Sequence, residues 1–250
     1  FLSLKTGAQY TLSDNLNFKI LELSTHNSFN SGGFDLIGER IFFGGNGNTN
    51  FSNSTVTLSD DSPWNLTGSQ SNMTYNSSSH IIFTSASADI LINGWNAASH
   101  LPNFTLQNSS STLRIGYLLK NRTVTFDGNV NLNGSARFYA DEGAANASGN
   151  ITSLTINGDL NLNSSQTYEF GITNNFTVTG SVNALTNCSS GPITIKGING
   201  ASFNTNFTGS VNISYALIGN SNALNSHTVT NCTDLGGNTN WTFNAPNTPA

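Results

Sequence analysis

Apolar and polar residues alternate along most of this chain, and four of the alternating segments share one arrangement around a glycine. These segments are Val124–Leu132, Leu154–Leu162, Phe176–Val182 and Phe207–Ile213. Their glycines, Gly128, Gly158, Gly180 and Gly209, recur at comparable but unequal intervals. Strict alternation is typical of a strand with one buried face. A unit of about 20 to 30 residues that carries such strands predicts an architecture of stacked repeats.

The rest of the chain is less regular but contains the same kind of segment. Strand-like runs cover residues 16–23, 34–43, 54–59, 81–84, 90–92 and 112–119. Asn, Ser and Thr fill 102 of the 250 positions, and these residues disfavour helix because they compete with its backbone hydrogen bonds. The 16 Phe residues and the regularly spaced Ile, Leu and Val supply enough apolar surface for a core.

We therefore predict an all-β fold, a right-handed parallel β-helix that forms a single elongated domain over residues 1–243. Coils of about 22 residues would stack about 4.8 Å apart and give a rod about 50 Å long. Asn side chains that face inward at turns are expected to form ladders, and Gly and Asn are expected to supply positive φ angles at corners. A pair of β-sandwiches is the alternative. Residues 244–250 are predicted to be a linker or tail.

Charge and motif spacing exclude several classes of function. With 8 basic and 13 acidic residues and a net charge of −5, the chain has no footprint for nucleic acid. No apolar run approaches the roughly 20 residues that a membrane span needs. No Cys/His cluster has the spacing of a zinc site, and Asp127-x-Asn129-x-Asn131 lacks the Gly and Glu of a calcium loop. We expect no metal and no cofactor.

Catalytic residues are not evident either. The four histidines, His26, His80, His100 and His227, have no catalytic partner at motif spacing. Asp60-Asp61 and Asp141-Glu142 are the only adjacent acidic pairs. A glycan-cleaving enzyme needs two carboxylates at one site, whereas neighbours on a strand point to opposite faces. We interpret both pairs as solvated turn residues and predict that the protein is not an enzyme.

The glycosylation acceptor pattern Asn-x-Ser/Thr is dense. It begins at Asn50, Asn53, Asn65, Asn72, Asn76, Asn103, Asn108, Asn121, Asn133, Asn146, Asn150, Asn163, Asn175, Asn187, Asn206, Asn212, Asn231 and Asn240. These are 18 of the 40 Asn, where composition alone would give about 10. Alternating strands rich in Asn and Thr generate the pattern automatically, and N-glycosylation at some of these positions is the other interpretation.

Two further features have competing interpretations. Trp64 and Trp95 lie beside loop-like segments, where they would either stack on glycans or pack at the edge of a coil. Cys188 and Cys232 could form one disulfide. Their separation spans two coils, about 9.6 Å at equivalent positions, so the bond requires a laterally displaced loop.

The final part of the chain resembles β-helix segments of large secreted surface proteins and adhesins of bacteria, particularly Bacteroidota. The resemblance rests on residues 210–223 and 231–243, which include Asp234-Leu235-Gly236-Gly237-Asn238 and Trp241-Thr242-Phe243. It extends upstream over residues 153–197 and is looser at residues 32–37 and 80–84. Leu224-Asn225 departs from the Gly pair usual there. The resemblance implies a structural or adhesive segment without catalytic residues.

These observations together predict an extracellular or cell-surface β-solenoid that acts as a rigid spacer or as an assembly unit of a filament. The expected partners are other copies of the chain or neighbouring domains, with surface polysaccharide as a further possibility, and neither nucleic acid nor membrane insertion. A carbohydrate-binding module on a β-helix is the alternative, and a glycan-cleaving β-helix enzyme is a weaker one.

Overall fold

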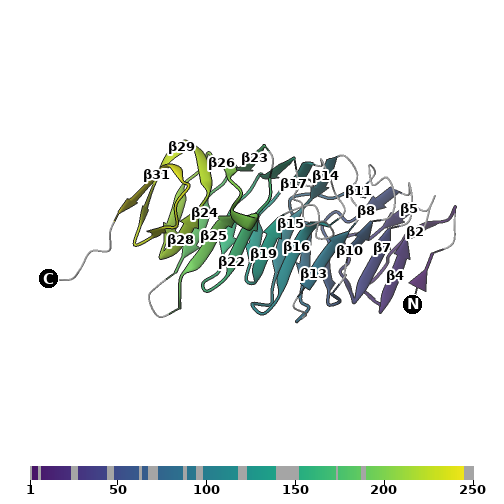
Figure 1. Cartoon of the computed structure of the whole chain (residues 1–250). Helices are drawn as coiled ribbons and strands as arrows, with labels where there is room; N and C mark the ends of the chain where they lie inside the picture. The colour runs from purple at the N-terminus through teal and green to yellow at the C-terminus, as the bar shows by residue number, and fades with distance from the viewer. Residues whose placement is uncertain are drawn as a thin grey trace.

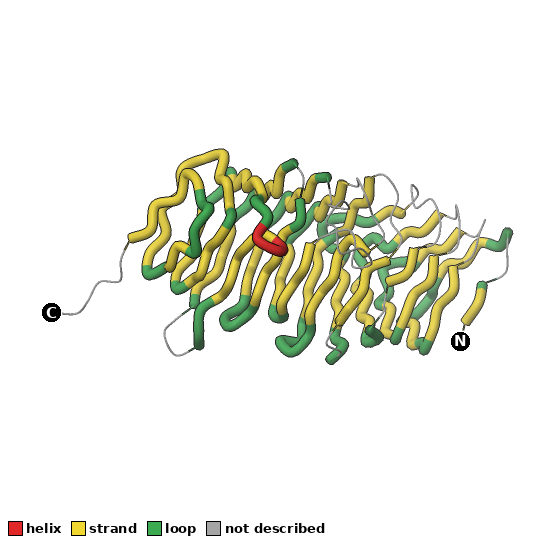
Figure 2. The backbone as a smooth tube through the Cα atoms, viewed as in Figure 1, coloured by secondary structure: helices red, strands yellow, loops and turns green. Residues whose placement is uncertain are grey.

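The computed structural model describes residues 2–4, 7–23, 28–43, 48–61, 64–66, 73–86, 89–93, 98–117, 123–138, 152–172, 174–186 and 190–244. Within these ranges the secondary structure is β-strand, apart from one turn of 3₁₀-helix, η1 (Ile198–Gly200). Figures 1 and 2 show an elongated stack of strands with the two termini at opposite ends. No helix of the described residues has the length and apolar character needed to cross a membrane.

Three parallel sheets make up the stack, and most strands pair with the third strand before or after them along the chain. Sheet A contains β1 (Leu2–Ser3), β4 (Ile20–Leu23), β7 (Arg40–Phe43), β10 (Trp64–Leu66), β13 (Asp89–Asn93), β16 (Thr112–Tyr117), β19 (Ser135–Phe138), β22 (Thr167–Phe170), β25 (Ile193–Gly197), β28 (Ala216–Gly219) and β30 (Thr233–Asp234). Sheet B contains β2 (Gln9–Thr11), β5 (Ser28–Asn30), β8 (Asn48–Asn50) and β11 (Met73–Thr74).

Sheet C has two arms. The first arm contains β14 (Ala98–Leu101), β17 (Thr123–Phe126), β20 (Ser153–Ile156), β23 (Asn175–Val178) and β26 (Phe203–Phe207). The second arm contains β3 (Leu16–Asn17), β6 (Leu36–Gly38), β9 (Thr55–Leu58), β12 (His80–Phe83), β15 (Asn103–Leu106), β18 (Val130–Leu132), β21 (Leu160–Leu162), β24 (Val182–Leu185) and β27 (Val211–Ser214). The long strand β29 (Ser221–Thr230) joins the arms, and β31 (Thr239–Asn244) pairs with it.

All strand pairings among the described residues are parallel, which confirms the all-β, parallel part of the fold prediction. The alternative of β-sandwiches does not fit, because sandwiches are built from antiparallel strands. The chain passes from sheet A to sheet B or the first arm of sheet C, then to the second arm, and returns to sheet A.

The observed register has the same spacing as the recurring glycines of the sequence. Phe126 pairs with Ile156, which is followed by Val178 and Phe207 at the same position of the next strands. The steps between these four residues are identical to the steps between the four glycines. A single coil length does not hold along the chain, because Leu21 pairs with Ile41 whereas Ala136 pairs with Tyr168 after a much longer step. The runs 16–23 and 34–43 each contain two strands separated by a corner.

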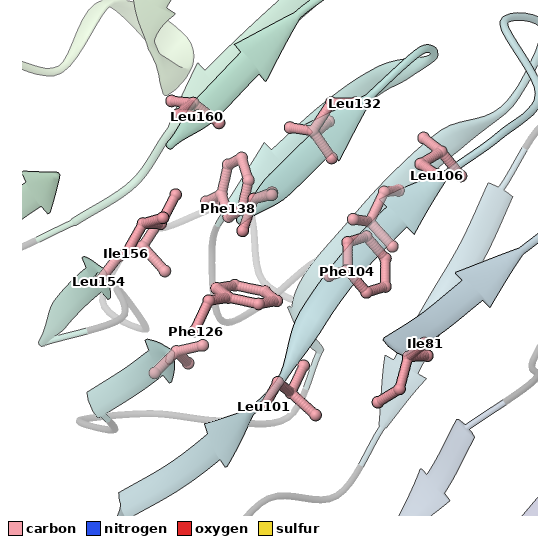
Figure 3. Packing of buried hydrophobic residues seen from close by; sticks show 14 of the residues in the cluster. Ile81, Leu101, Phe104, Leu106, Phe126, Leu132, Phe138, Leu154, Ile156 and Leu160 are labelled. Carbon is pink, nitrogen blue, oxygen red and sulfur yellow. The ribbon is translucent and has the colours of Figure 1, made fainter. Parts of the chain in front are cut away.

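The core is one continuous apolar cluster from Leu4 to Val229, built from the inward residues of every sheet. Strands such as β12, β15 and β20 alternate half-buried and buried positions, as their sequences predict. Phe170 stacks on Phe138 and Phe203 at centroid distances of 5.1 and 4.9 Å. Figure 3 shows Phe104, Phe126 and Phe138 directed into the space between the strands. Trp241 and Phe243 pack against this cluster at its C-terminal end.

Four stacked glycines form one corner of the repeats, and the reason for glycine there is close approach. A Cβ on Gly180 would lie 2.6 Å from the carbonyl carbon of Gly158, and a Cβ on Gly209 would overlap the carbonyl oxygen of Gly180. Gly128, Gly158, Gly180 and Gly209 are absent from the positive-φ residues, so the expectation of positive φ is wrong for them. It is correct at other corners, including Asn53 and Asn220, with φ of 61° and 58°.

We expect Gly209→Ala to lower the free energy of unfolding by about 1–3 kcal/mol, because the added methyl group meets rigid backbone of the preceding repeat. The measurement is urea unfolding followed by circular dichroism. Ser210→Ala, which changes an exposed neighbour, is the control and should leave the midpoint unchanged. Equal midpoints for the two variants would show that the repeats are not stacked in this register.

Candidate functional site

A ladder of side-chain amides crosses the outward face of the second arm of sheet C. Asn161 Nδ2 donates to Asn131 Oδ1 at 2.7 Å, Asn183 Nδ2 to Asn161 Oδ1 at 2.9 Å, and Asn212 Nδ2 to Asn183 Oδ1 at 2.9 Å. Asn131 Nδ2 continues the series to Thr105 Oγ1 at 3.2 Å. An amide carries both a donor and an acceptor, so identical residues in register can join a series of any length.

This ladder corrects the prediction that Asn ladders form from inward-facing side chains. Asn131, Asn161 and Asn183 are half-buried and alternate with core residues such as Val130 and Leu132, so they lie on the solvent side of the strands. The physical reason is that the interior is filled by apolar side chains, whereas an amide at the surface keeps water for its remaining hydrogen bonds.

A second ladder runs along the corner where the stacked glycines lie. Asn103 Oδ1 accepts the backbone N–H of Asn129 at 2.9 Å, and Asn129 Oδ1 accepts that of Asp159 at 2.8 Å. Asp159 Oδ1 accepts the N–H of Ser181 at 2.7 Å. Each side chain therefore fixes the backbone of the following repeat at the turn, in addition to the backbone hydrogen bonds there.

A cluster of polar side chains surrounds Asp127, which follows β17. Tyr75 Oη donates to Asp127 Oδ2 at 2.7 Å, and His100 Nδ1 lies 3.0 Å from the same oxygen. Asn157 Nδ2 donates to Asp127 Oδ1 at 3.0 Å. The four residues come from four successive repeats, so a single carboxylate ties these repeats together.

A hollow of about 240 Å³ lies beside this cluster. Its lining residues are Tyr75, Asn76, Ser77, Pro102, Asn103, Asp127 and Gly128. Burial raises the pKa of Tyr75, and the hydrogen bond and charge of Asp127 raise it further, so Tyr75 stays a protonated donor. The hollow offers carboxylate, amide and hydroxyl groups to a small polar ligand. It is smaller than the roughly 300–1,000 Å³ of pockets for drug-sized ligands.

Sequence spacing did not indicate this cluster. His100 and Asp127 are 27 residues apart, whereas β14 and β17 pair with a step of 25 residues, so His100 lies opposite Thr125 and Asp127 follows just after β17. The sequence gives no histidine a partner at motif spacing, and His100 meets Asp127 only through the fold. No sequence signal marks the pair, because the repeat length varies along the chain and the two residues are not in register.

The acidic pair Asp60-Asp61 forms ion pairs, because Arg40 contacts both carboxylates. Arg40 Nη2 lies 2.7 Å from Asp60 Oδ2 and 3.5 Å from Asp61 Oδ1. Burial raises the pKa of Asp60, but hydrogen bonds from Asp61 and Arg40 and the charge of Arg40 outweigh it and lower the pKa to about 2. The hydrogen bond and charge of Asp60 raise the pKa of Asp61.

Two carboxyl groups with separated pKa values are also found in glycosidases, but those stand at least about 5 Å apart around the sugar. Arg40 instead joins Asp60 and Asp61 in one ion-pair cluster, and the backbone N–H of Asp61 donates to Asp60 Oδ1 at 2.6 Å, so these carboxylates do not flank a space for a sugar. The other pair, Asp141-Glu142, lies outside the described residues. Among the described residues no group of three or more His, Cys, Asp or Glu could hold a metal ion.

The predicted glycosylation acceptors differ in what their side chains do. Asn103 uses Nδ2 for two hydrogen bonds, to the carbonyls of Ser77 and Ser79, so a glycan there would break one of them. The Nδ2 atoms of Asn76, Asn133, Asn163, Asn212 and Asn240 each donate one. Asn50, Asn53, Asn108, Asn175, Asn206 and Asn231 are at least partly exposed. Asn72, Asn121, Asn146, Asn150, Asn187 and the side chain of Asn65 lie outside the described residues.

The remaining predicted residues are only partly described. Trp64 pairs in register with Ile41 of the neighbouring strand, but its side chain lies outside the described part of the structure. Trp95 lies outside the described residues altogether. Cys232 is half-buried, and its thiol donates to the carbonyl oxygen of Thr230 at 3.2 Å. Burial raises the pKa of this thiol. Cys188 lies outside the described residues, so the disulfide stays a prediction.

The Arg40 contact makes stability depend on pH in a defined direction. Because the folded pKa of Asp60 lies below its unfolded value, its contribution is present above about pH 4 and is lost as the pH falls toward 2. Arg40→Gln should raise that pKa, lower the free energy of unfolding at pH 7 by on the order of 1 kcal/mol, and shrink the loss between pH 4 and 2.

Urea unfolding of both proteins between pH 2 and 7 measures this effect. Lys19→Gln is the matched control, because the Lys19 side chain is 70% exposed and its ammonium group lies 3.9 Å from Glu39. Parallel pH profiles for Arg40→Gln and the unmodified protein would contradict the assignment.

No protein-family model matches this chain, and no match is found among the curated proteins or the solved structures. What the protein does must therefore be inferred from its residues and from the ladders, clusters and hollow that its strands create.

Proposed function

We propose that the protein is a right-handed parallel β-helix that serves outside the cell as a rigid spacer or assembly unit of a surface protein or filament. The observation that carries the proposal is the Asn ladder of the second arm of sheet C, because it links successive repeats by side chains as well as by backbone. The closed right-handed path is supported by the cyclic order of strands and by the strong right-handed preference of parallel crossovers.

Stiffness along the stack has three sources. Backbone hydrogen bonds run parallel to the long axis, the core cluster continues along the stack, and the two side-chain ladders link repeats on one face and at one corner. Strand pairing joins each repeat to its neighbours, as in other repeat proteins, so length can grow without a change in local structure.

The surface supports an extracellular location. Charged residues make up 8% of the chain and Asn, Ser and Thr dominate, with the acceptor pattern for N-glycans repeated along it. The resemblance to secreted surface proteins and adhesins of Bacteroidota points the same way. In this role the protein is not an enzyme, and its partners are other copies, neighbouring domains of a longer chain, or surface polysaccharide.

If the protein is a rigid rod, two spin labels at equivalent positions of different strands should give one narrow distance distribution. Ile37 and Asn212 occupy equivalent positions of β6 and β27, seven strand steps apart, and both are exposed. At about 4.8 Å per step their backbones should lie about 34 Å apart. Spin labels at Ile37→Cys and Asn212→Cys, with Cys188 and Cys232 replaced by Ser, report this distance by pulsed electron paramagnetic resonance.

The matched control places the second label at Asn161→Cys, five steps from position 37, and should give about 24 Å. Distances that scale with the number of steps support the rod. A broad distribution, or two equal distances, would overturn it.

A carbohydrate-binding module is the second candidate, favoured by the hollow beside Asp127. Carboxylate, amide and phenol groups converge there, and Pro102 adds an apolar surface. Trp64 and Trp95 were the sequence candidates for this role, and neither side chain is described.

If this candidate is correct, a neutral mono- or disaccharide from a panel should bind, and Asp127→Asn should weaken it about tenfold or more through loss of a charged acceptor. Isothermal titration calorimetry measures the affinity, with Asp14→Asn, an exposed carboxylate far along the chain, as the control. Absence of heat for the whole panel at millimolar concentration would reject the binding role and leave the spacer role intact.

A further inference from the structure

A row of ionisable side chains lies on the outward face of sheet A. Arg114, Arg137, Glu169 and Lys196 occupy equivalent positions on the adjacent strands β16, β19, β22 and β25. The residue before each of them, Leu113, Ala136, Tyr168 and Ile195, is buried in the core. The four charged residues therefore share one face of one sheet and follow the long axis of the stack.

The row concentrates positive charge in a chain that has little of it. Three of its four members are basic, out of eight Lys and Arg in 250 residues whose net charge is −5. Even when Asp89, which pairs in register with Thr112, is counted, the row stays positive. Such a concentration is not expected from composition alone.

Glu169 neutralises only part of this charge. Its Oε2 lies 2.7 Å from Arg137 Nε and its Oε1 lies 3.3 Å from Lys196 Nζ. The Glu169 side chain is 12% exposed, whereas those of Arg137 and Lys196 are 39% and 40% exposed. The carboxylate is thus covered, and the cations around it remain accessible to an anion from solvent.

Arg114 and Arg137 stand directly opposite each other in register. Like charges at such positions destabilise a sheet, and on the Arg137 side the ion pair with Glu169 offsets this repulsion. Two guanidinium groups carried by neighbouring strands, whose backbones lie about 4.8 Å apart, can also hold one carboxylate or successive carboxylates along a linear chain.

A shallow groove of about 440 Å³ follows the same row. Its lining residues are Thr112, Arg114, Ser135, Arg137, Thr167, Glu169 and Lys196. A second row of hydroxyl-bearing residues, Thr112, Ser135 and Thr167, therefore runs beside the charged one. Hydroxyl groups beside cations suit a ligand that carries both acidic and alcohol groups.

We propose that this groove binds a linear acidic polysaccharide, with its carboxylate groups on Arg114, Arg137 and Lys196 and its hydroxyl groups against the Thr/Ser row. A single-stranded nucleic acid is less suited to the groove, because its sites combine cations with aromatic platforms for the bases, and the described residues that line this groove include no aromatic one. The interaction is distinct from the spacer role and from the hollow beside Asp127, which lies off sheet A.

Polygalacturonate is the probe, with its methyl ester as the uncharged counterpart, and affinity electrophoresis or biolayer interferometry at 20 and 150 mM salt is the measurement. The unmodified protein should bind polygalacturonate, more weakly at the higher salt, and should not bind the ester. Lys196→Gln and Arg114→Gln should each weaken binding about two- to fivefold.

Glu169→Gln provides the readout that a purely structural row would not give. It removes the negative charge from the centre of the row, so affinity should rise about two- to fivefold. Lys19→Gln removes a cation from another part of the chain and should change nothing. Circular dichroism at the assay temperature checks that each variant is folded.

The proposal is overturned if the ester binds as well as polygalacturonate, if Lys19→Gln weakens binding as much as Lys196→Gln, or if a folded Glu169→Gln does not bind more tightly. Tighter binding of a single-stranded oligonucleotide than of polygalacturonate would also overturn it. None of these results affects the spacer proposal, which the label distances test separately.

Discussion

The core, the ladders and the charged rows of this structure all depend on one constraint, the parallel pairing of each strand with its counterpart one repeat further along the chain. Such pairing places a residue directly beside its counterpart in the next repeat, so residues of the same kind form rows along the stack. Val130, Leu160, Val182 and Val211 form one such row, and the stacked glycines form another. A shift of one residue would exchange the buried and exposed faces of a strand, so the apolar rows hold the register.

This stacking of equivalent residues also explains why the chain has many Asn and few charged residues. A charged residue repeated in register would repel itself, whereas an amide donates to the residue on one side and accepts from the residue on the other. The series Asn131, Asn161, Asn183 and Asn212 shows this solution. Several charged side chains instead meet a partner of opposite sign, such as Arg40 with Asp60.

The features that depart from this rule are those with a candidate function. Arg114 opposite Arg137 is a stack of like charges, and Asp127 gathers donors from several repeats beside a hollow. A rod of uniform repeats needs neither the Arg114–Arg137 pair nor the Asp127 cluster. The structure thus combines a regular framework, suited to spacing or assembly, with two local surfaces on which a saccharide could be held.

The sequence by itself determined the strands and, where glycines recur, the stacking of repeats. Alternation predicted β12 and β20, and the recurrence of Gly128, Gly158, Gly180 and Gly209 predicted stacked repeats, whose observed register has the same steps. It could do so because a two-residue period and a glycine without Cβ are local properties that each segment carries.

Only the tertiary structure decided which polar side chains meet. Arg114, Arg137, Glu169 and Lys196 are separated by unequal stretches of chain, because the corners between strands vary in length. No fixed period therefore aligns these residues in the sequence. Their contacts exist because apolar rows on the opposite face of the same strands fix the register, and the polar residues are carried into position by it.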